Sequence, residues 1–450
     1  MRRAPTVALV SGLSVLLVPA LLLASPAASS GFGPRTRSLG GAGTAVVNDA
    51  AAVFENPSAL TLAEGTGLSF GFSSNGYSFE ENGNEASIET VNAFEFGLVV
   101  PGAIHDLPVA FGFALSLPNG RLSRVRSVAA SESFWPLPDA NSQMVDLGAA
   151  LAIRPWKPLL LGGGIGYLAS LSGGFHITGT AVAVDRFGSE YDSDLHHAVA
   201  ADLTSSRYAL LGVSVVPWER FTLALAYRSA ARVDQQIEGG LDGVLRTGPL
   251  DIPVAYSFQT SATVSYSPAQ VAFGASYRSP ELTLLSFELT SQRWSAYPAP
   301  YANTSSSLSA ELPPGLDIIL PPPAVGTDPP PSKLRDRLVP SLGFEQGFEP
   351  AAGVGLTGRL GYAFERSPVP EDQDATRFLD LDRHVLSLGA GFELSGHGLP
   401  MQKLVLDAFC SLALGVSRTL AAGEEGEQQV SGSALAGGVS LGLVFGSGAR

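Results

Sequence analysis

Residues 109–117 read VAFGFALSL. Val109, Phe111 and Phe113 begin a series of large apolar residues at odd positions, and Ala, Gly, Ala and Ser fill the even positions between them. A period of two places successive side chains on opposite faces of a β-strand. The stretch therefore predicts a strand with one apolar face and one face of small residues.

The same alternation recurs along most of the chain. Leu68, Phe70 and Phe72 form another such series. These segments predict about fourteen strands, at residues 66–78, 93–101, 108–118, 142–154, 158–170, 205–217, 219–231, 253–279, 282–292, 338–347, 354–364, 384–395, 403–416 and 432–446. We interpret 253–279 as one long strand with a bulge, because a closed barrel whose two ends lie on one side needs an even number of strands.

The connections between these strands alternate between long and short. Outer-membrane barrels have long external loops and short periplasmic turns. We therefore expect the long connections, notably 171–204 and 293–337, to be extracellular. Trp156 and Trp218 fall in short turns, where a Trp side chain fits the headgroup level of the membrane.

The composition favours a membrane protein. Of the 450 residues, 45% are hydrophobic and only 15% are charged, whereas soluble proteins carry about a quarter charged residues. After the N-terminal region, no apolar run is long enough for a membrane helix. A closed sheet pairs its backbone groups internally and leaves no edge in hydrocarbon. We therefore predict an all-β fold, a transmembrane antiparallel β-barrel that occupies residues 66–450.

Residues 1–28 have the pattern of a secretory signal peptide. The basic opening MRR precedes the apolar run VALVSGLSVLLVPALLLA, and Ser25, Ala27 and Ala28 suit cleavage. A membrane anchor is the alternative interpretation, because the run is close to spanning length.

A glycine cluster, GGAG at residues 40–43, follows the signal peptide. A dinucleotide-binding loop needs a preceding strand and a following helix within a βαβ unit, and neither surrounds these glycines. We expect residues 29–65 to form a compact segment with a helical turn that stops at Asn56–Pro57. An unobstructed barrel of this width would leave a pore. We therefore predict that residues 29–65 are a plug, or hatch, inside the lumen.

Several runs of the chain together carry a family resemblance. They are GGAGTA at 40–45, NDA at 48–50, VFENPSAL at 53–60, QRWS at 292–295, GYAFERSPVP at 361–370 and DRH at 382–384. In these runs the chain resembles the FadL family of outer-membrane transporters for long-chain fatty acids and other hydrophobic compounds. The Asn-Pro-Ala signature of that family maps onto Asn56, Pro57 and Ser58, with Ser at the third position. The resemblance implies that these three residues join the plug to the wall.

The resemblance also implies a function, which is passive transport across the outer membrane of a Gram-negative cell. A long-chain fatty acid is caught by the external loops, binds in the lumen, and leaves when the plug shifts or through an opening in the wall. The family places the distorted wall at the third strand, here residues 108–118. Two alternatives stay open: uptake of aromatic or other small hydrophobic compounds, and a structural or adhesin barrel without transport.

Arginines at the lumen-facing phase are candidates for binding a ligand carboxylate. Arg228, Arg278 and Arg359 occupy the small or polar phase of their strands, and a guanidinium matches a carboxylate in a bidentate fashion. The alternative interpretation is that they pair with lumen carboxylates, such as Glu95 and Asp407, and brace the barrel.

The sequence argues against an enzyme. It contains no HExxH, GxSxG or paired-cysteine spacing, and its single cysteine, Cys410, cannot form an intrachain disulfide. The net charge of −14 argues against a nucleic-acid partner, which needs a basic surface. We expect no cofactor and no metal site. The expected partners are a hydrophobic small molecule and outer-membrane lipid, around a multi-pass barrel that is a monomer.

Overall fold

The computed structural model describes residues 31–86, 88, 90–119, 133–137, 145–178, 181–184, 190–193, 196–247, 250–298, 303–311, 322–326, 332–371, 377–396, 400–421 and 426–446. The predicted signal peptide, residues 1–28, lies outside these ranges. Within them, no helix has the length and apolar character needed to span a membrane.

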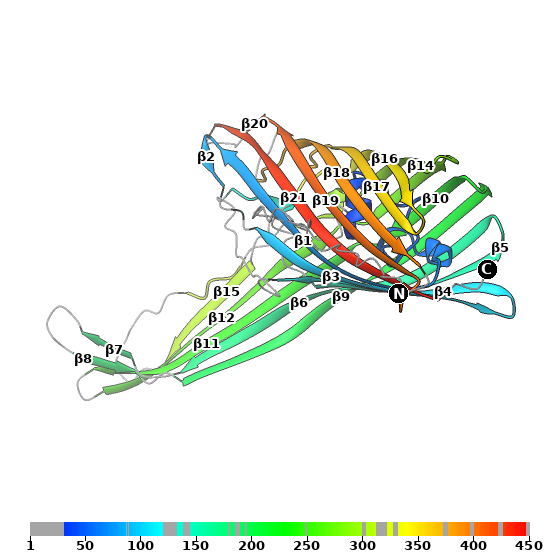
Figure 1. The fold of residues 1–450 in the computed structure, drawn as a ribbon. Helices are drawn as coiled ribbons and strands as arrows, with labels where there is room; N and C mark the ends of the chain where they lie inside the picture. The colour runs from blue at the N-terminus through cyan, green and yellow to red at the C-terminus, as the bar shows by residue number, and fades with distance from the viewer. Residues whose placement is uncertain are drawn as a thin grey trace, which may run out of the picture.

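Fourteen antiparallel strands close into a barrel (Figure 1). In chain order they are β1 (Thr66–Glu81), β3 (Val91–Ile104), β4 (Leu107–Pro118), β5 (Val145–Trp156), β6 (Leu159–Thr178), β9 (His196–Trp218), β10 (Phe221–Arg228), β13 (Gln270–Arg278), β14 (Thr283–Gln292), β16 (Arg337–Ala351), β17 (Val354–Glu365), β18 (Asp382–Ser395), β19 (Lys403–Val416) and β21 (Glu427–Phe445). Each pairs with the next, and β21 pairs back onto β1. The predicted closed barrel and its strand number are confirmed.

One predicted strand is wrong. Residues 253–279 form two strands, β12 (Leu250–Ser267) and β13. The break falls at Pro268, which has no backbone N–H to donate to a ladder. β13 lies in the barrel wall, whereas β12 pairs with β11 (Ala231–Thr247) and β15 (Asn303–Ala310) outside the ring. The barrel keeps its strand number because β12 is not part of it.

A long sheet extends beyond one end of the barrel (Figure 1). It contains β11, β12, β15 and the far ends of β6 and β9, which stay paired out to Thr178 and His196. Strands therefore occupy parts of 171–204 and 293–337, which the sequence predicts to be loops. Polar pairs such as Ser257 Oγ and Ser307 Oγ, 2.8 Å apart, bridge the strands of this extension. The apolar alternation that identifies the barrel strands is weak here for that reason.

β4 is a regular strand. It pairs along its length with β3 and, over residues 109–116, with β5, and neither ladder contains a register shift. The distortion that the family resemblance implies for residues 108–118 is therefore not present in this wall. Pro108 and Pro118 lie near the ends of β4, where a missing N–H disturbs a ladder least.

The two faces of the barrel differ in polarity, as the period-two pattern predicts. Large apolar side chains on the outer face are exposed, for example Phe70 at 50% and Leu151 at 65%. Trp156 and Trp218, at 66% and 69% exposure, lie at the ends of their strands, where the interface interpretation places them. The inner face carries small residues and buried charges.

The N-terminal segment, residues 31–65, lies within the ring of strands (Figure 1). It contains α2 (Gly33–Ser38), α3 (Ala52–Glu55) and the 3-10 helix η1 (Pro57–Leu62). α2 contacts β17, β18, β19 and β21, whereas α3 and η1 contact β4 and β5 and η1 also contacts β6 and β9. Contacts with both sides of the ring hold the segment in the lumen.

Candidate functional site

Local sequence signals shape the N-terminal segment. Pro34 lies in the first turn of α2, where its missing N–H has no partner to lose. Asn56 ends α3 in an extended conformation and caps η1, because its side chain accepts a hydrogen bond from the Ser58 backbone N–H. Pro57 opens η1. The sharp turn between the two helices therefore follows from Asn56–Pro57.

The Asn56–Pro57–Ser58 motif faces the wall at β6 and β9. Asn56 is fully buried, and its Nδ2 donates to the Thr44 carbonyl and to Ser214 Oγ on β9, each at 2.8 Å. Ser58 Oγ donates to Asn56 Oδ1 at 2.7 Å and lies 2.8 Å from Ser214 Oγ. The Ser at the third motif position thus adds a hydroxyl that bonds both the motif and the wall.

Glycines in the wall let the segment approach the strands closely. A Cβ placed at Gly162 on β6 would lie 2.3 Å from the Pro57 backbone carbonyl carbon. On the opposite side, a Cβ at Gly361 on β17 would lie 2.1 Å from the Gly40 backbone nitrogen, and Gly40 has a positive φ of +67°. Larger residues at either wall position would push the segment away.

Apolar side chains of the segment pack against one half of the wall. Phe32, Val53, Phe54 and Leu60 belong to a buried cluster. Its wall members, mostly small residues, come from β3, β4, β5, β6 and β9 and from the start of β11: Val99, Ala110, Ala114, Ala150, Ala152, Leu168, Tyr208, Leu210, Ala231 and Val233. Hydrophobic burial therefore holds the segment on this side of the lumen.

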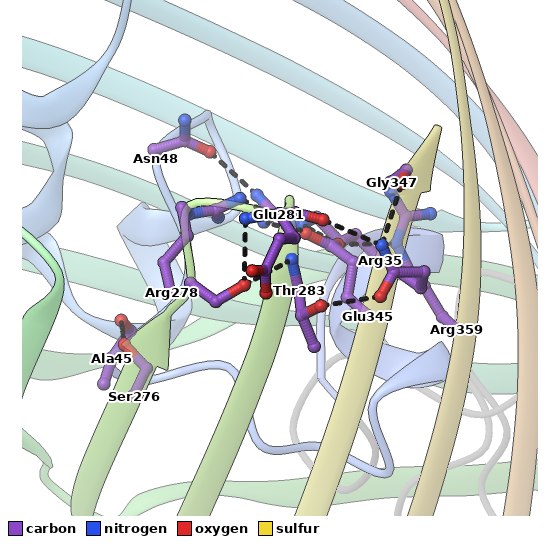
Figure 2. Close-up of polar contacts among 12 residues, drawn as sticks. Arg35, Ala45, Asn48, Ser276, Arg278, Glu281, Thr283, Glu345, Gly347 and Arg359 are labelled. Atoms are coloured by element: carbon purple, nitrogen blue, oxygen red, sulfur yellow. Dashed lines mark hydrogen bonds and ion pairs between the residues drawn. The ribbon is translucent and has the colours of Figure 1, made fainter. Parts of the chain in front are cut away.

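Ion pairs hold the segment on the other side (Figure 2). Arg35 of α2 forms a bidentate ion pair with Glu345 of β16, with Nε–Oε2 at 2.9 Å and Nη2–Oε1 at 3.0 Å. Arg35 Nη1 also donates to Asn48 Oδ1 at 3.0 Å. Arg359 of β17 donates to the same Glu345 at 2.8 Å and pairs with Asp407 of β19. The segment and three wall strands thus share one buried charge network.

Two further carboxylates of the wall bind the segment. Glu95 of β3 pairs with Arg37 and accepts a hydrogen bond from the Gly33 backbone N–H at 3.2 Å. Glu288 of β14 accepts from the Thr44 backbone N–H at 2.8 Å. A buried carboxylate costs free energy unless it is paired and hydrogen-bonded, so these partners fix the segment in place.

A polar cavity lies between the segment and the wall. Its lining includes Arg37 and Glu55 of the segment and Arg228, Glu288 and Arg337 of the wall. Burial, together with the nearby carboxylate of Glu288, raises the pKa of Glu55 to about 7. The lumen beside the segment is therefore charged on this side and apolar on the other.

The three predicted arginines have different surroundings. Arg359 is buried between Glu345 and Asp407. Arg278 is half exposed, with Nη1 3.8 Å from Glu345 Oε1 (Figure 2). Arg228 lines the polar cavity. The structure therefore brings Arg278 and Arg359 to one carboxylate and places Arg228 in the cavity.

Sequence reasoning missed the partners that the segment supplies. Arg35 and Arg37 carry the ion pairs with Glu345 and Glu95, although only the wall charges were considered as lumen residues. The signal was available, because two arginines in the run GPRTRS stand out in a chain with few charges. Ser214 gave no such signal, since it is one of many small residues on the inner face.

Aromatic side chains gather where several connections between strands meet. Phe134, Tyr297 and Phe378 belong to one buried cluster, which also contains Trp294 and Tyr266. The rings of Tyr266 and Tyr297 lie 5.4 Å apart, and those of Tyr297 and Phe378 lie 6.2 Å apart. The connections after β4, β14 and β17 supply most of these residues. They therefore share an apolar core at one end of the barrel.

Comparison with solved structures places the fold. The chain is similar to a Pseudomonas aeruginosa FadL homologue, with a TM-score of 0.59 and 16% identity over 94% of this chain and 99% of that chain. It is also similar to the CymD monoaromatic hydrocarbon channel, with a TM-score of 0.52 and 16% identity over 93% and 99%. For the P. putida toluene transporter TodX the values are 0.50 and 13% over 92% and 99%. At these identities the likeness concerns the fold.

Comparison of the sequence with protein families gives the assignment. A search of curated proteins found no match. Residues 20–445 match the family described as outer membrane protein transport protein (OMPP1/FadL/TodX). The chain therefore belongs to this family, and it is an outer-membrane transport channel for hydrophobic compounds and not an enzyme.

Proposed function

We propose that the N-terminal segment is the plug of this channel and that hydrophobic molecules pass the barrel when it moves. The observation that carries the proposal is the position of residues 31–65 inside the ring, in contact with both sides of the wall. The Asn56–Pro57–Ser58 motif is the joint on one side, and the pair of Arg35 with Glu345 is the joint on the other. A plug with two separate joints can release one and pivot on the other.

The two joints hold the plug by different interactions, and this difference determines which of them opens. The side that faces β4 to β9 is largely apolar, and the hydrogen bonds of Asn56 and Ser58 with Ser214 are among its contacts. The side that faces β14 to β19 depends on charges. An apolar ligand can replace the apolar contacts between the segment and the wall, whereas it cannot replace the partner of a buried charge. We therefore infer that the ligand passes between the segment and β4–β9, and that the ion pairs of Arg35 with Glu345 and of Arg37 with Glu95 stay closed.

Entry begins at the aromatic cluster. Tyr266, Trp294, Tyr297 and Phe378 come largely from the long connections between strands, which are external in barrels of this kind. The rings are buried against one another, so the cluster orders the connections around the entry, and the ligand enters beside it. Transport is passive, and consumption of the ligand inside the cell supplies the gradient.

The ligand that we propose is a long-chain fatty acid. Arg228 is the best-placed partner for its carboxylate, because this residue lines the cavity beside the plug. Arg359 lies between two carboxylates, and Arg278 lies beside Glu345. Arg228 also has partners, in Glu55, Asp146 and Tyr208. Because these arginines already have partners within the protein, a second candidate also has support. It is a neutral aromatic or other small hydrophobic compound, whose binding requires no cation.

Uptake by whole cells distinguishes the two candidates. A Gram-negative host without its own channel of this family is given radiolabelled oleate or toluene, and the protein or a variant is expressed. For the fatty-acid proposal, Arg228→Ala lowers oleate uptake several-fold and leaves toluene uptake unchanged. Arg154→Ala is the matched control, because among the described residues the guanidinium of Arg154 bonds only the Lys157 carbonyl. Toluene uptake with no oleate uptake would instead select the neutral ligand.

A further inference from the structure

An apolar hollow lies on the lipid-facing side of the barrel wall. It has a volume of about 830 Å³ and crosses β10, β13, β14, β16, β17 and β18, which lie side by side in the wall (Figure 1). Large apolar side chains on the outer face surround it, and at least half of each is exposed: Leu285, Leu342, Leu360, Leu386 and Leu388. The hollow therefore opens toward the membrane.

The N-terminal segment closes the hollow from behind. Glycines form part of its floor. A Cβ at Gly361 would lie 2.1 Å from the Gly40 backbone nitrogen, and a Cβ at Gly343 would lie 2.9 Å from the Leu39 Cβ. The segment thus fills the lumen directly behind this part of the wall. Pockets of about 300–1,000 Å³ hold small molecules in proteins, and here the occupant must come from the surrounding lipid.

An aromatic group joins the hollow to the external ends of the strands. Tyr362 lines the hollow, and its Oη lies 2.9 Å from His384 Nδ1. The rings of His384 and Phe364 lie 5.1 Å apart. β17 and β18 are joined here by the long connection at 366–381, and the long connections of such barrels are external. Aromatic side chains in this position lie at the level of the lipid headgroups.

Three exposed arginines lie at the external ends of the same strands. Arg366 directly follows β17 and has the same alternation phase as Tyr362, which places it on the outer face. Arg335 donates its backbone N–H to the carbonyl of Pro368, two residues beyond Arg366, at 2.8 Å. Arg293 directly follows β14, which is paired with β16 up to its last residue. Within the described ranges, none of the three arginines forms an ion pair.

An anion is the expected partner of these three arginines. The carboxylates at the same strand ends are already engaged. Asp336 and Asp382 each accept a backbone N–H, at 2.9 and 2.8 Å, and Glu365 pairs with Arg383 at 2.9 Å. Guanidinium groups match phosphate oxygens in a bidentate fashion. An apolar hollow next to a set of phosphate-binding cations fits a phosphorylated lipid.

We propose that this face of the barrel binds a phosphorylated glycolipid of the outer leaflet, the lipid A portion of lipopolysaccharide. One acyl chain occupies the hollow against Leu360 and Leu386, and a phosphate group lies on the arginines. The four-residue step from Tyr362 to Arg366 covers about 13 Å along a strand, which leads from the hydrocarbon into the headgroup region. The site goes beyond the proposed transport and does not depend on it.

A second copy of the chain is the competing occupant of the hollow. A symmetric contact places the same patch of both subunits face to face, so the arginines of the two copies would approach one another. Like charges at a short distance repel. Lipid therefore fits this surface better than self-association does.

Native mass spectrometry of the purified protein in detergent tests the headgroup. The probes are lipid A, the same lipid after removal of its phosphates, and phosphatidylglycerol. The variant is Arg293→Gln with Arg366→Gln, and the control is Arg154→Gln with Arg220→Gln, which lie in or beside short turns at the other end of the barrel. One basic residue near a lipid headgroup changes affinity about fivefold. The variant is therefore expected to bind lipid A about 30-fold more weakly, and the control as tightly as the wild type.

A second pair of variants tests the hollow. Leu342→Trp fills it, whereas Leu151→Trp places the same ring on the outer face of β5, away from it. We expect Leu342→Trp to weaken lipid A binding about tenfold, because the acyl chain loses its contacts with the hollow, and Leu151→Trp to leave binding unchanged. The proposal is overturned if the phosphate-free lipid or phosphatidylglycerol binds as tightly as lipid A, or if the variants bind like their controls. A wild-type dimer that Leu342→Trp dissociates would assign the hollow to a second copy instead.

Discussion

Replacement of Asn56 by Ala releases the plug from β9 without changing the barrel. The Asn56 side chain makes four hydrogen bonds, to the Thr44 carbonyl, to Ser214 Oγ, and to the backbone N–H and hydroxyl of Ser58. Each contributes about 0.5–1.5 kcal/mol net, and the bond between the Ser58 and Ser214 hydroxyls survives. Four bonds of this size sum to about 2–6 kcal/mol. Only the bond to Ser214 joins the segment to the wall, so this sum is the expected loss in stability of the docked segment as a whole.

Amide hydrogen exchange of residues 31–65 measures this loss in the folded barrel. A loss of about 2–6 kcal/mol corresponds to exchange that is faster by about 30-fold to about 10,000-fold, because about 1.4 kcal/mol is a factor of ten. Ser58→Ala is the graded control, since it keeps the bonds of Asn56 to Thr44 and Ser214. It removes the two bonds of the Ser58 hydroxyl and costs about 1–3 kcal/mol. If Asn56→Ala left the exchange of residues 31–65 unchanged, or if exchange rose equally in the barrel strands, the claim that Asn56 holds the segment to β9 would be refuted.

Three further perturbations act on the same segment. Glu345→Gln leaves two buried arginines without their shared carboxylate, so we expect residues 33–38 to lose about 3–5 kcal/mol of protection against exchange. The pKa of Glu55 is raised to about 7. Its stabilising contribution is therefore complete below the unfolded pKa of about 4.5 and is lost as the pH rises toward 7. Protection of the segment against exchange should fall by up to about 3 kcal/mol over that pH range, and Glu55→Gln should abolish this pH dependence. Gly361→Ala drives a methyl group into the Gly40 backbone and should open a measurable ion conductance, whereas Gly358→Ala on the same strand, with open space around its Cα, should not.

The barrel was predictable because its wall obeys one simple rule. Alternation such as Val109, Phe111 and Phe113 follows from the need for one face in lipid and one face toward the lumen. The sheet extension lies beyond the end of the barrel and carries polar pairs between its strands, so its strands do not follow that alternation. β11 and β15 were missed for this reason, and β12 was joined to β13 across Pro268.

The candidate site was predictable in part. Asn56, Pro57 and Ser58 were found through family resemblance, and the structure places them against β6 and β9. Their wall partner, Ser214, could not be found, because a contact between residues 156 or more positions apart leaves no local signal. The same holds for Arg35 and Glu345, whose pairing depends on where the segment folds back into the barrel.

Ion conductance in planar bilayers tests most directly the claim that residues 31–65 stop the bore. The wild-type barrel is predicted to be closed to ions, and a variant without residues 31–62 is predicted to form a steady open pore. A wild-type barrel that conducts as freely as the truncated one would contradict the account.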